Sequence, residues 1–577
     1  MRKSAFLPVP KYFIGAHSAQ IRTLFRALAI VLAGVHVWAA ISSQSMNPDG
    51  ISYLDIGDAY FRADWENAIN PVWSPFYSWL LGLANFVFKP SMPWQFPTVH
   101  IVNFLIYLAA LLSFEFMWGK IRTSDTKQES IRIPESLWWA LGYLLFIWIS
   151  LSLIQIWAVT PDMLMATFVF LAAGLIAQIR TGDHEVRVFL QLGLVLGLGY
   201  LSKTFMFVTA LVFLGIVAYM AWQTKISFSK VFVTAGTFLV ISLPFILLIS
   251  EKKDKFTIGE VGRLTYARYV NGIPYPHWQG DPSNNIVLIH PSRLIHQAPP
   301  VYEFSDPIGG TYPISTDPSY WYDGLKIQFQ PEGLLARLLA SGLFYIDLFI
   351  EKQGVLIAFI MALYFVRKRQ DLTFFEIIKK WSLVIPAVTT FVLYAAVWVE
   401  DRYVGVFVLL FWADILANVR MPDTASNRSL LKGLGVLAVL GLIVNILVFN
   451  LDGLNRLNPS QQASDTSRMS HPAKPLSVAH ALNDVGVVQG DRVGVIGYGF
   501  DSFWARLAGV QIVAEMLEWD AEEFWQGDEA LRQNILRAFA NTGVDAVVAE
   551  HVPGYAGLHN WHQVENSNYY IYVFQEQ

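Results

Sequence analysis

The chain has 577 residues, of which 54% are hydrophobic and only 15% charged, and its mean hydropathy is +0.40. This composition is too apolar for a soluble chain of this size and predicts a polytopic membrane protein. The formal net charge of −4, without a long Lys/Arg tract, argues against nucleic acid as a partner. The absence of cysteine excludes disulfides, thiolate nucleophiles and Cys-ligated metals.

Apolar runs divide most of the chain into membrane-spanning helices, each of which needs roughly 20 mostly apolar residues. Two further runs, 72–88 and 332–350, are expected to be juxtamembrane or re-entrant helices on the outer side. Counting the first of them as a full crossing would put the basic loop Lys120 to Arg132 outside. The sequence therefore predicts about eleven spans, at 24–43, 97–118, 137–157, 163–180, 188–202, 204–222, 231–250, 353–366, 381–398, 403–419 and 431–449.

The short loops between these spans set the expected orientation. Cytoplasmic loops carry an excess of Lys and Arg. A cytoplasmic N-terminus places on the inside the basic loops Lys120 to Arg132, Arg180 to Arg187, Lys225 to Lys230, Arg367 to Arg369 and Arg420 to Lys432. The outer face then carries loop 44–96, the turn 159–162, the long loop 251–331 and everything after 450.

The composition changes at about residue 451. Residues 451–475 are polar and contain prolines, which is typical of a linker. After them, apolar β-type stretches alternate with helix-like ones, which predicts a small extracytoplasmic α/β domain at 476–577. Residues 1–450 then form the transmembrane domain.

The first outer loop concentrates acidic and aromatic residues, in the stretch 46–60 (MNPDGISYLDIGDAY) and just after it. Aromatic rings stack on the C–H faces of a sugar, while carboxylates bind its hydroxyls. The alternative is that Asp49 only caps a helix. Besides Asp49, the candidates for binding the sugar or acceptor are Tyr53, Asp55, Asp58, Trp73 and Tyr77.

Three further ionisable residues lie at expected outer ends of spans. Asp162 follows Thr160-Pro161 between two apolar runs and is a functional candidate, although it can simply start the next helix. Lys203 stands among apolar residues, where an ammonium can neutralise a lipid phosphate or merely snorkel to the interface. Arg402 can grip a phosphate with two hydrogen bonds, or pair with a neighbouring acid to join two helices.

The loop 251–331 is long for an unstructured connection, and its aromatic, Pro and Gly residues favour a binding role. Arg263 and His277 are its candidate site residues. His277, His290 and His296 are separated by 13 and 6 residues, which matches no helical pair of metal ligands. The histidines therefore give little support to a metal site.

The order of these motifs resembles the GT-C glycosyltransferases. They run from Asp49-Gly50 through Trp73-Ser74-Pro75-Phe76-Tyr77, Thr160-Pro161-Asp162 and Leu201-Ser202-Lys203 to Asp401-Arg402-Tyr403. The similarity is to the family of protein O-mannosyltransferases and lipid A aminoarabinose transferases, which use polyprenyl-phosphate sugars. In that family the first loop more often reads Asp-Glu. Gly50 removes the second acid here, so no residue is assigned to a metal, although a divalent metal remains open.

The resemblance implies an inverting transfer from a polyprenyl-phosphate sugar to a hydroxyl of a glycan, lipid or protein. Asp49 would be the general base, and Asp162 would position the acceptor or assist in place of a metal. Lys203 and Arg402, with Arg263 from the long loop, would bind the donor phosphate. It also implies a multi-pass protein of a bacterial inner membrane. A transporter and a non-catalytic membrane protein with an outer binding domain remain as alternatives.

Overall fold

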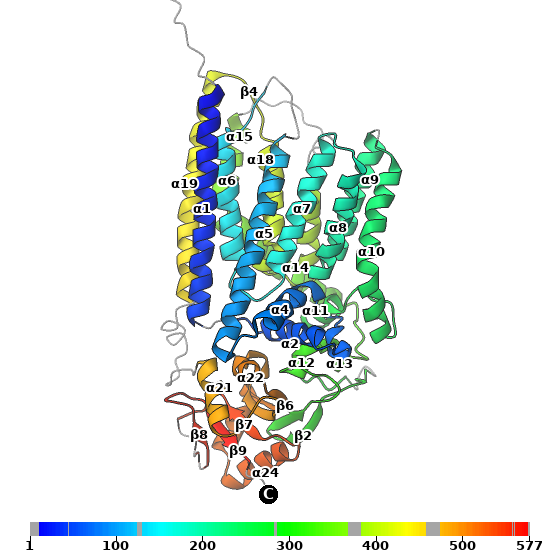
Figure 1. Cartoon of the computed structure of the whole chain (residues 1–577), viewed down its shortest axis with the longest axis vertical. Helices are drawn as coiled ribbons and strands as arrows, with labels where there is room; N and C mark the ends of the chain where they lie inside the picture. Colours follow the sequence, from blue (N-terminus) through cyan, green and yellow to red (C-terminus); the bar gives the residue numbers. More distant parts are fainter. Residues whose placement is uncertain are drawn as a thin grey trace, which may run out of the picture.

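The computed structural model describes residues 11–43, 46–123, 130–224, 226–281, 286–366, 382–456, 474–554, 556, 558 and 560–574. It contains a bundle of long helices, a layer of short helices beneath one end of the bundle, and a mixed sheet beyond that layer (Figure 1). We call the end of the bundle that faces the sheet the domain end.

Among the described residues, eight helical segments are long and apolar enough to cross a membrane. They correspond to α1 (Lys11–Ser43), α5 (Gln95–Thr123), α6 (Glu135–Trp148), α7 (Asp162–Arg180), α9 (Met206–Gln223), α10 (Phe228–Lys252), α14 (Pro331–Ile346) and α19 (Ala425–Arg456) with their helical extensions. Shorter helices complete the bundle, namely α8 (Val186–Ser202), α15 (Gly354–Val366), α17 (Val384–Ala395) and α18 (Asp401–Ala417). Each of the eleven predicted spans contains a helix, and the predicted multi-pass helical fold is confirmed.

The two runs predicted to be re-entrant differ from each other. Residues 72–88 contain α4 (Pro75–Phe88), which has only 14 residues and lies in the layer of short helices, as expected (Figure 1). Residues 332–350 instead form α14 and a π-helical turn, and together these are long and apolar enough to cross a membrane. The hydroxyls of Ser341 and Tyr345 donate to carbonyls of α17, at Ala395 and Phe391. This run therefore packs along a bundle helix, and its role as a juxtamembrane or re-entrant helix stays a prediction.

The basic loops gather at the end of the bundle away from the sheet (Figure 1). There β1 (Ser130–Ile131) pairs with β4 (Met421–Pro422), and the Lys230 ammonium donates to the carbonyl of His184. The predicted basic residues Lys225 and 367–369 lie outside the described residues.

The layer of short helices comes from the first and the long outer loops. It comprises α2 (Asp49–Phe61), α3 (Trp65–Ala68), α4, α11 (Val261–Tyr269), α12 (Pro313–Thr316) and α13 (Pro318–Trp321). Helices α2 and α4 cross closely at two glycines. A Cβ on Gly57 would lie 2.6 Å from the Ser78 carbonyl, and one on Gly82 would lie 2.5 Å from the Gly57 carbonyl. This crossing, which only glycines permit, fixes the position of α2.

The predicted C-terminal α/β region is confirmed. Its central strands β6 (Gln511–Leu517), β5 (Arg492–Gly497) and β7 (Ala546–Ala549) are parallel and neighbour one another in that order, and β9 (Tyr570–Val573) and β8 (His562–Gln563) follow β7. The helices are α21 (Pro475–Asp484), α22 (Phe503–Ala508), α23 (Ala521–Gln526) and α24 (Glu529–Ala540).

The sheet also includes two strands from far earlier in the chain. The hairpin β2 (Arg293–Gln297) and β3 (Pro300–Glu303) comes from the long loop, and β3 pairs with β6. The sheet therefore takes two strands from outside the range 476–577. Most of the predicted linker 451–475 lies outside the described residues.

Candidate active site

Asp49 is the first residue of α2, and it does not act as the helix cap. Pro48 is the N-cap residue, and no side chain caps this helix by a hydrogen bond. The Asp49 Oδ2 atom accepts a hydrogen bond from Arg402 Nη1 at 3.0 Å, whereas Oδ1 accepts none from the part of the chain that the structure describes. Because 21% of its side chain is exposed, one oxygen of this carboxylate is open to a ligand.

Arg402 lies between two carboxylates from different elements. Its Nε atom donates to Glu400 at 2.8 Å, and Nη1 donates to Asp49. Glu400 also accepts from the Trp398 indole at 2.8 Å. Arg402 thus joins α18 to α2. Its pairing with Glu400 is the alternative in which an Arg of this turn pairs with a neighbouring acid. Asp401, the other neighbouring acid, pairs with Lys352 at 3.3 Å.

Lys203 and Asp162 form the second ion pair. Lys203 follows the last residue of α8, and its ammonium donates to the carboxylate of Asp162, the first residue of α7. The Asp162 side chain is only 1% exposed, so it needs this countercharge. Lys203 therefore does not snorkel away from the protein, and its ammonium is fixed by α7.

Tyr403 connects the two ion pairs. Its ring centroid is 4.2 Å from Lys203 Nζ and 5.2 Å from Arg402 Cζ, so both cations lie against the same aromatic ring. The ring stacks in turn on Tyr394 at 5.2 Å. We call this group the charged cluster; it comprises Asp49, Asp162, Lys203, Glu400, Arg402 and Tyr403.

The residue after Asp49 must be small for the cluster to form. The Val159 amide donates to the Asn47 side chain at 2.5 Å, so the turn before α7 packs against the start of α2. A Cβ on Gly50 would lie 2.9 Å from Val159 Cβ. Gly50, which stands where the resembled family often has an acid, is thus required by this contact.

The aromatic candidates of the first loop pack beside α2. Tyr53 is 6% exposed and makes edge-to-face contacts with Trp73 at 5.0 Å and with Tyr77 at 5.1 Å. The Trp73 indole donates to the Ser315 carbonyl at 2.9 Å, and the Tyr77 hydroxyl donates to Asn103 at 2.6 Å. Tyr53 and Tyr77 are buried, and only Trp73 is partly exposed.

Asp55 and Asp58 bind the C-terminal domain. Arg506 of α22 donates to Asp55 at 2.7 Å and to Asp58 at 2.5 Å. Asp55, which is 6% exposed, also accepts from the backbone amide of Thr311 at 2.7 Å and from its hydroxyl at 3.0 Å. These two carboxylates hold the domain and the long loop against α2.

Arg263 and His277 have other partners. Arg263 donates to Glu260 at 2.6 Å and to the Leu325 carbonyl at 2.8 Å. Although burial raises the pKa of Glu260, Arg263 and Lys255 hold it below its ordinary value. His277 is 6% exposed, and its ring lies 2.5 Å from Glu515 of β6. The structure therefore brings neither residue into the charged cluster.

From the sequence, Tyr403 has no assigned role, and Glu400 is considered only as an acid that can pair with Arg402. Their signal was their place beside Arg402 in one charged turn. Arg506 gave no local signal, since it is a single Arg in a short helix. Among the described residues, no group of three or more His, Asp or Glu side chains is arranged to hold a metal ion.

Comparisons with known proteins give similarity to solved structures only. No family model and no curated protein match the chain. Crystal structures of ArnT from Cupriavidus metallidurans, apo and bound to undecaprenyl phosphate, align with a TM-score of 0.48 at 12% and 13% identity, covering 95% of this chain and 97% of that one. An Archaeoglobus fulgidus oligosaccharyltransferase, in complex with Zn and sulfate, aligns with a TM-score of 0.48 at 11% identity, covering 92% and 67%.

The aligned proteins are GT-C glycosyltransferases, the group that the sequence motifs resemble. With identities of 11 to 13% and TM-scores of 0.48, these alignments by themselves assign neither a reaction nor a substrate to this chain.

Proposed function

We propose that this protein is a membrane glycosyltransferase that moves a sugar from a polyprenyl-phosphate donor to a hydroxyl acceptor, with inversion. The observation that carries the proposal is the charged cluster. It combines one partly exposed carboxylate, with an oxygen free to accept a proton, and two cations held against one aromatic ring. These are the groups that a transfer from a sugar phosphate needs.

Each side chain then has a chemical role. The Asp49 Oδ1 atom takes the proton of the acceptor hydroxyl, whose oxygen forms the new bond to the anomeric carbon. The bond from that carbon to the phosphate oxygen breaks, and polyprenyl phosphate leaves with the electron pair. Lys203 and Arg402 stabilise the negative charge that develops on this phosphate.

For Asp162 we propose a role other than contact with the acceptor. A side chain that is 1% exposed and bonded to Lys203 is poorly placed to touch an acceptor. We therefore assign Asp162 as a positioning residue that keeps the Lys203 ammonium charged and in place.

We place the reaction on the outer side of a bacterial inner membrane, with the N-terminus in the cytoplasm. The described basic loops lie at the end of the bundle away from the sheet, and the positive-inside rule makes that end cytoplasmic. The charged cluster and the sheet are at the domain end, which is then outside.

The test is a transfer assay with the purified full-length chain in sealed vesicles. Radiolabelled polyprenyl-phosphate sugars and membrane acceptors are supplied, and the wild type is compared with Asp49→Asn. Covalent label on the acceptor that requires Asp49 supports the proposal. Label that enters the vesicles without covalent transfer favours a transporter. The absence of both transfer and uptake favours a non-catalytic binding protein.

A matched control is Glu332→Gln. Glu332 is an acidic residue in the first turn of α14, as Asp49 is in α2, and it lies outside the charged cluster. Transfer must persist in this variant. An equal loss in both variants would mean that the charge change, not the position of Asp49, is responsible.

A further inference from the structure

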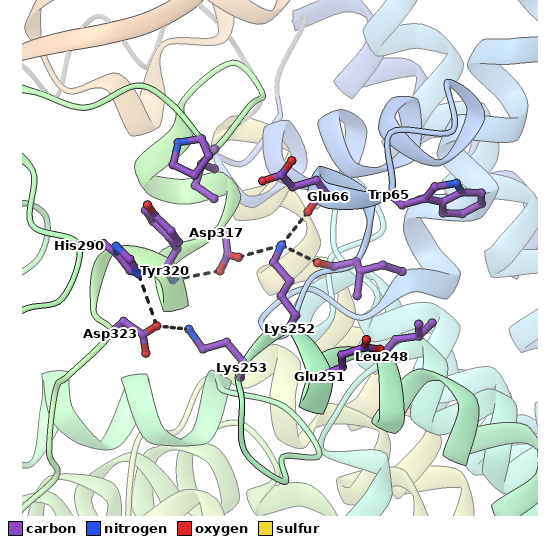
Figure 2. A pocket seen from close by; sticks show the side chains of 13 residues that line it. Trp65, Glu66, Leu248, Glu251, Lys252, Lys253, His290, Asp317, Tyr320 and Asp323 are labelled. Atoms are coloured by element: carbon purple, nitrogen blue, oxygen red, sulfur yellow. Dashed lines mark hydrogen bonds and ion pairs between the residues drawn. The ribbon is translucent and has the colours of Figure 1, made fainter.

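A pocket of about 490 Å³ opens at the domain end, separate from the charged cluster. Figure 2 shows its lining, which comes from α3, the end of α10 and the segment 290–323 of the long loop. Its volume is within the usual range for small-molecule sites, roughly 300–1,000 Å³. None of the six members of the charged cluster lines it.

Aromatic faces border the pocket on two sides. Trp65 lies on one side, and 60% of its surface is exposed. On the opposite side, the rings of His290 and Tyr320 stack in parallel with their centroids 4.0 Å apart (Figure 2). Exposed aromatic faces of this kind stack on the C–H faces of sugar rings.

The two ammonium groups of the pocket are already occupied. Lys252 Nζ donates to the carbonyls of Glu66 at 2.7 Å and Ile69 at 2.9 Å, and it lies 3.4 Å from Asp317. Lys253 Nζ donates to Asp323 at 2.9 Å (Figure 2). Each of these two cations therefore neutralises a carboxylate of the pocket itself.

The carboxylates are less fully used. Asp317 is 2% exposed, and its Oδ2 atom, which accepts no hydrogen bond from the described residues, is paired with the Lys252 ammonium at 3.4 Å. The side chains of Glu66 and Glu251 form no hydrogen bond or ion pair within that same part of the chain. The pocket contains four carboxylates and two ammonium groups, namely Glu66, Glu251, Asp317 and Asp323 against Lys252 and Lys253.

From these contacts we infer that this pocket binds carbohydrate, and that it takes uncharged or basic sugar units. The aromatic faces bind the rings, the carboxylates of Glu66 and Glu251 accept hydrogen bonds from sugar hydroxyls, and the excess of carboxylates repels acidic sugars. Its further role rests on the proposed transferase function: the pocket would hold the part of an acceptor glycan that is distant from the reacting hydroxyl. The carbohydrate binding itself does not depend on that function.

The pocket is linked to α2 through the short helices of the long loop. On one side of this segment, Asp317 and Tyr320 line the pocket. On the other side, the Ser315 carbonyl accepts hydrogen bonds from Ser52 at 3.1 Å and from Trp73 at 2.9 Å. A glycan held in the pocket would therefore lie beside the helix that carries Asp49.

The test measures trisaccharide binding to the full-length protein by calorimetry. Lipid nanodiscs are used, because maltoside detergents themselves present sugar. The probes are mannotriose, which is uncharged, the glucosamine trisaccharide, which is basic, and trigalacturonate, which is acidic. The first two should bind, and trigalacturonate should bind at least about tenfold more weakly, a difference of about 1.4 kcal/mol.

Variants of the pocket identify the site. Trp65→Ala should weaken mannotriose binding about tenfold, and Glu66→Gln with Glu251→Gln should remove the preference against trigalacturonate. Trp94→Ala is the matched control, because Trp94 is also 60% exposed but does not line the pocket. Equal binding of all three probes, no binding of any, or unchanged binding in Trp65→Ala would overturn the inference.

Asp49→Asn separates this inference from the proposed function. It should abolish transfer and leave trisaccharide binding unchanged. If transfer requires Asp49 but no trisaccharide binds to the wild type, the pocket inference fails alone. If Trp65→Ala removes binding but Asp49→Asn still transfers, the proposed function fails alone.

Discussion

Helix α2 carries one aspartate at its N-terminus and another in its middle, in different surroundings. Asp49, at the N-terminus, is 21% exposed and shares an Arg from α18 with Glu400. Asp55, in the middle of the helix, is 6% exposed and is held by Arg506 and two donors of Thr311. Asp49 keeps a free oxygen, and Asp55 does not. Exposure and unused hydrogen-bonding capacity therefore separate Asp49, the proposed general base, from Asp55, which holds the C-terminal domain.

The largest expected effect is at the N-terminal end. Asp49→Asn should lower the rate of sugar transfer about 10²- to 10⁴-fold, because the amide cannot accept the proton of the acceptor hydroxyl. The melting temperature should change little, since Arg402 keeps its ion pair with Glu400 at 2.8 Å and the Asn side chain has nearly the same shape as Asp. A transfer rate within threefold of the wild type would remove the distinction between Asp49 and Asp55.

Loss of the contacts that Arg506 makes with Asp55 and Asp58 should lower the free energy of unfolding. Arg506→Met leaves Asp55 and Asp58 without a countercharge and should destabilise the docked C-terminal domain by about 3–5 kcal/mol. Thermal unfolding and limited proteolysis of the full chain measure this. Adding Asp55→Asn and Asp58→Asn should restore most of the loss. If the triple variant is no more stable than Arg506→Met, the two carboxylates do not anchor the domain.

Lys203 tests whether the cluster acts as a unit. Lys203→Met should lower transfer about 10²- to 10³-fold, by analogy with the loss of one group that stabilises transition-state charge. It also leaves Asp162 buried without a countercharge. Lys203→Met with Asp162→Asn should recover the melting temperature but not the transfer rate. Recovery of both would show that Lys203 has only a structural role.

Gly57 tests the crossing that positions both ends of α2. Gly57→Ala places a Cβ 2.6 Å from the Ser78 carbonyl and should cost about 1–3 kcal/mol of stability. Gly34→Ala in α1 is the control, because its Cβ would meet nothing within 4 Å. That change should be neutral or stabilising. Similar melting temperatures for the two variants would contradict the close crossing.

The smallest expected effect concerns Glu260, whose carboxylate forms an ion pair with Arg263. Its pKa is below the ordinary value, so the stability it contributes is present at neutral pH and is lost as the pH falls through the lowered pKa. Glu260→Gln should therefore destabilise the chain by about 1 kcal/mol at pH 7. The difference from the wild type should shrink below about pH 4. Melting curves at pH 7 and at low pH check this, and a constant difference would contradict the pairing.

The sequence alone determined the elements whose signal is local. Hydropathy located the eleven predicted spans, because a membrane requires long apolar helices wherever the chain crosses it. The alternation of β-type and helix-like stretches located the C-terminal α/β region. The order of short motifs singled out Asp49, Asp162, Lys203 and Arg402, and the structure brings these four residues together.

Only the tertiary structure decided which partner each side chain has. Asp49 and Asp55 look alike in the sequence, but Arg402 and Arg506, which distinguish them, are 353 and 451 residues away. The hairpin that joins the C-terminal sheet and the segment that lines the carbohydrate pocket also come from the long loop. Such pairings depend on how packed helices and strands place distant residues, and no local pattern of hydropathy or spacing encodes that placement.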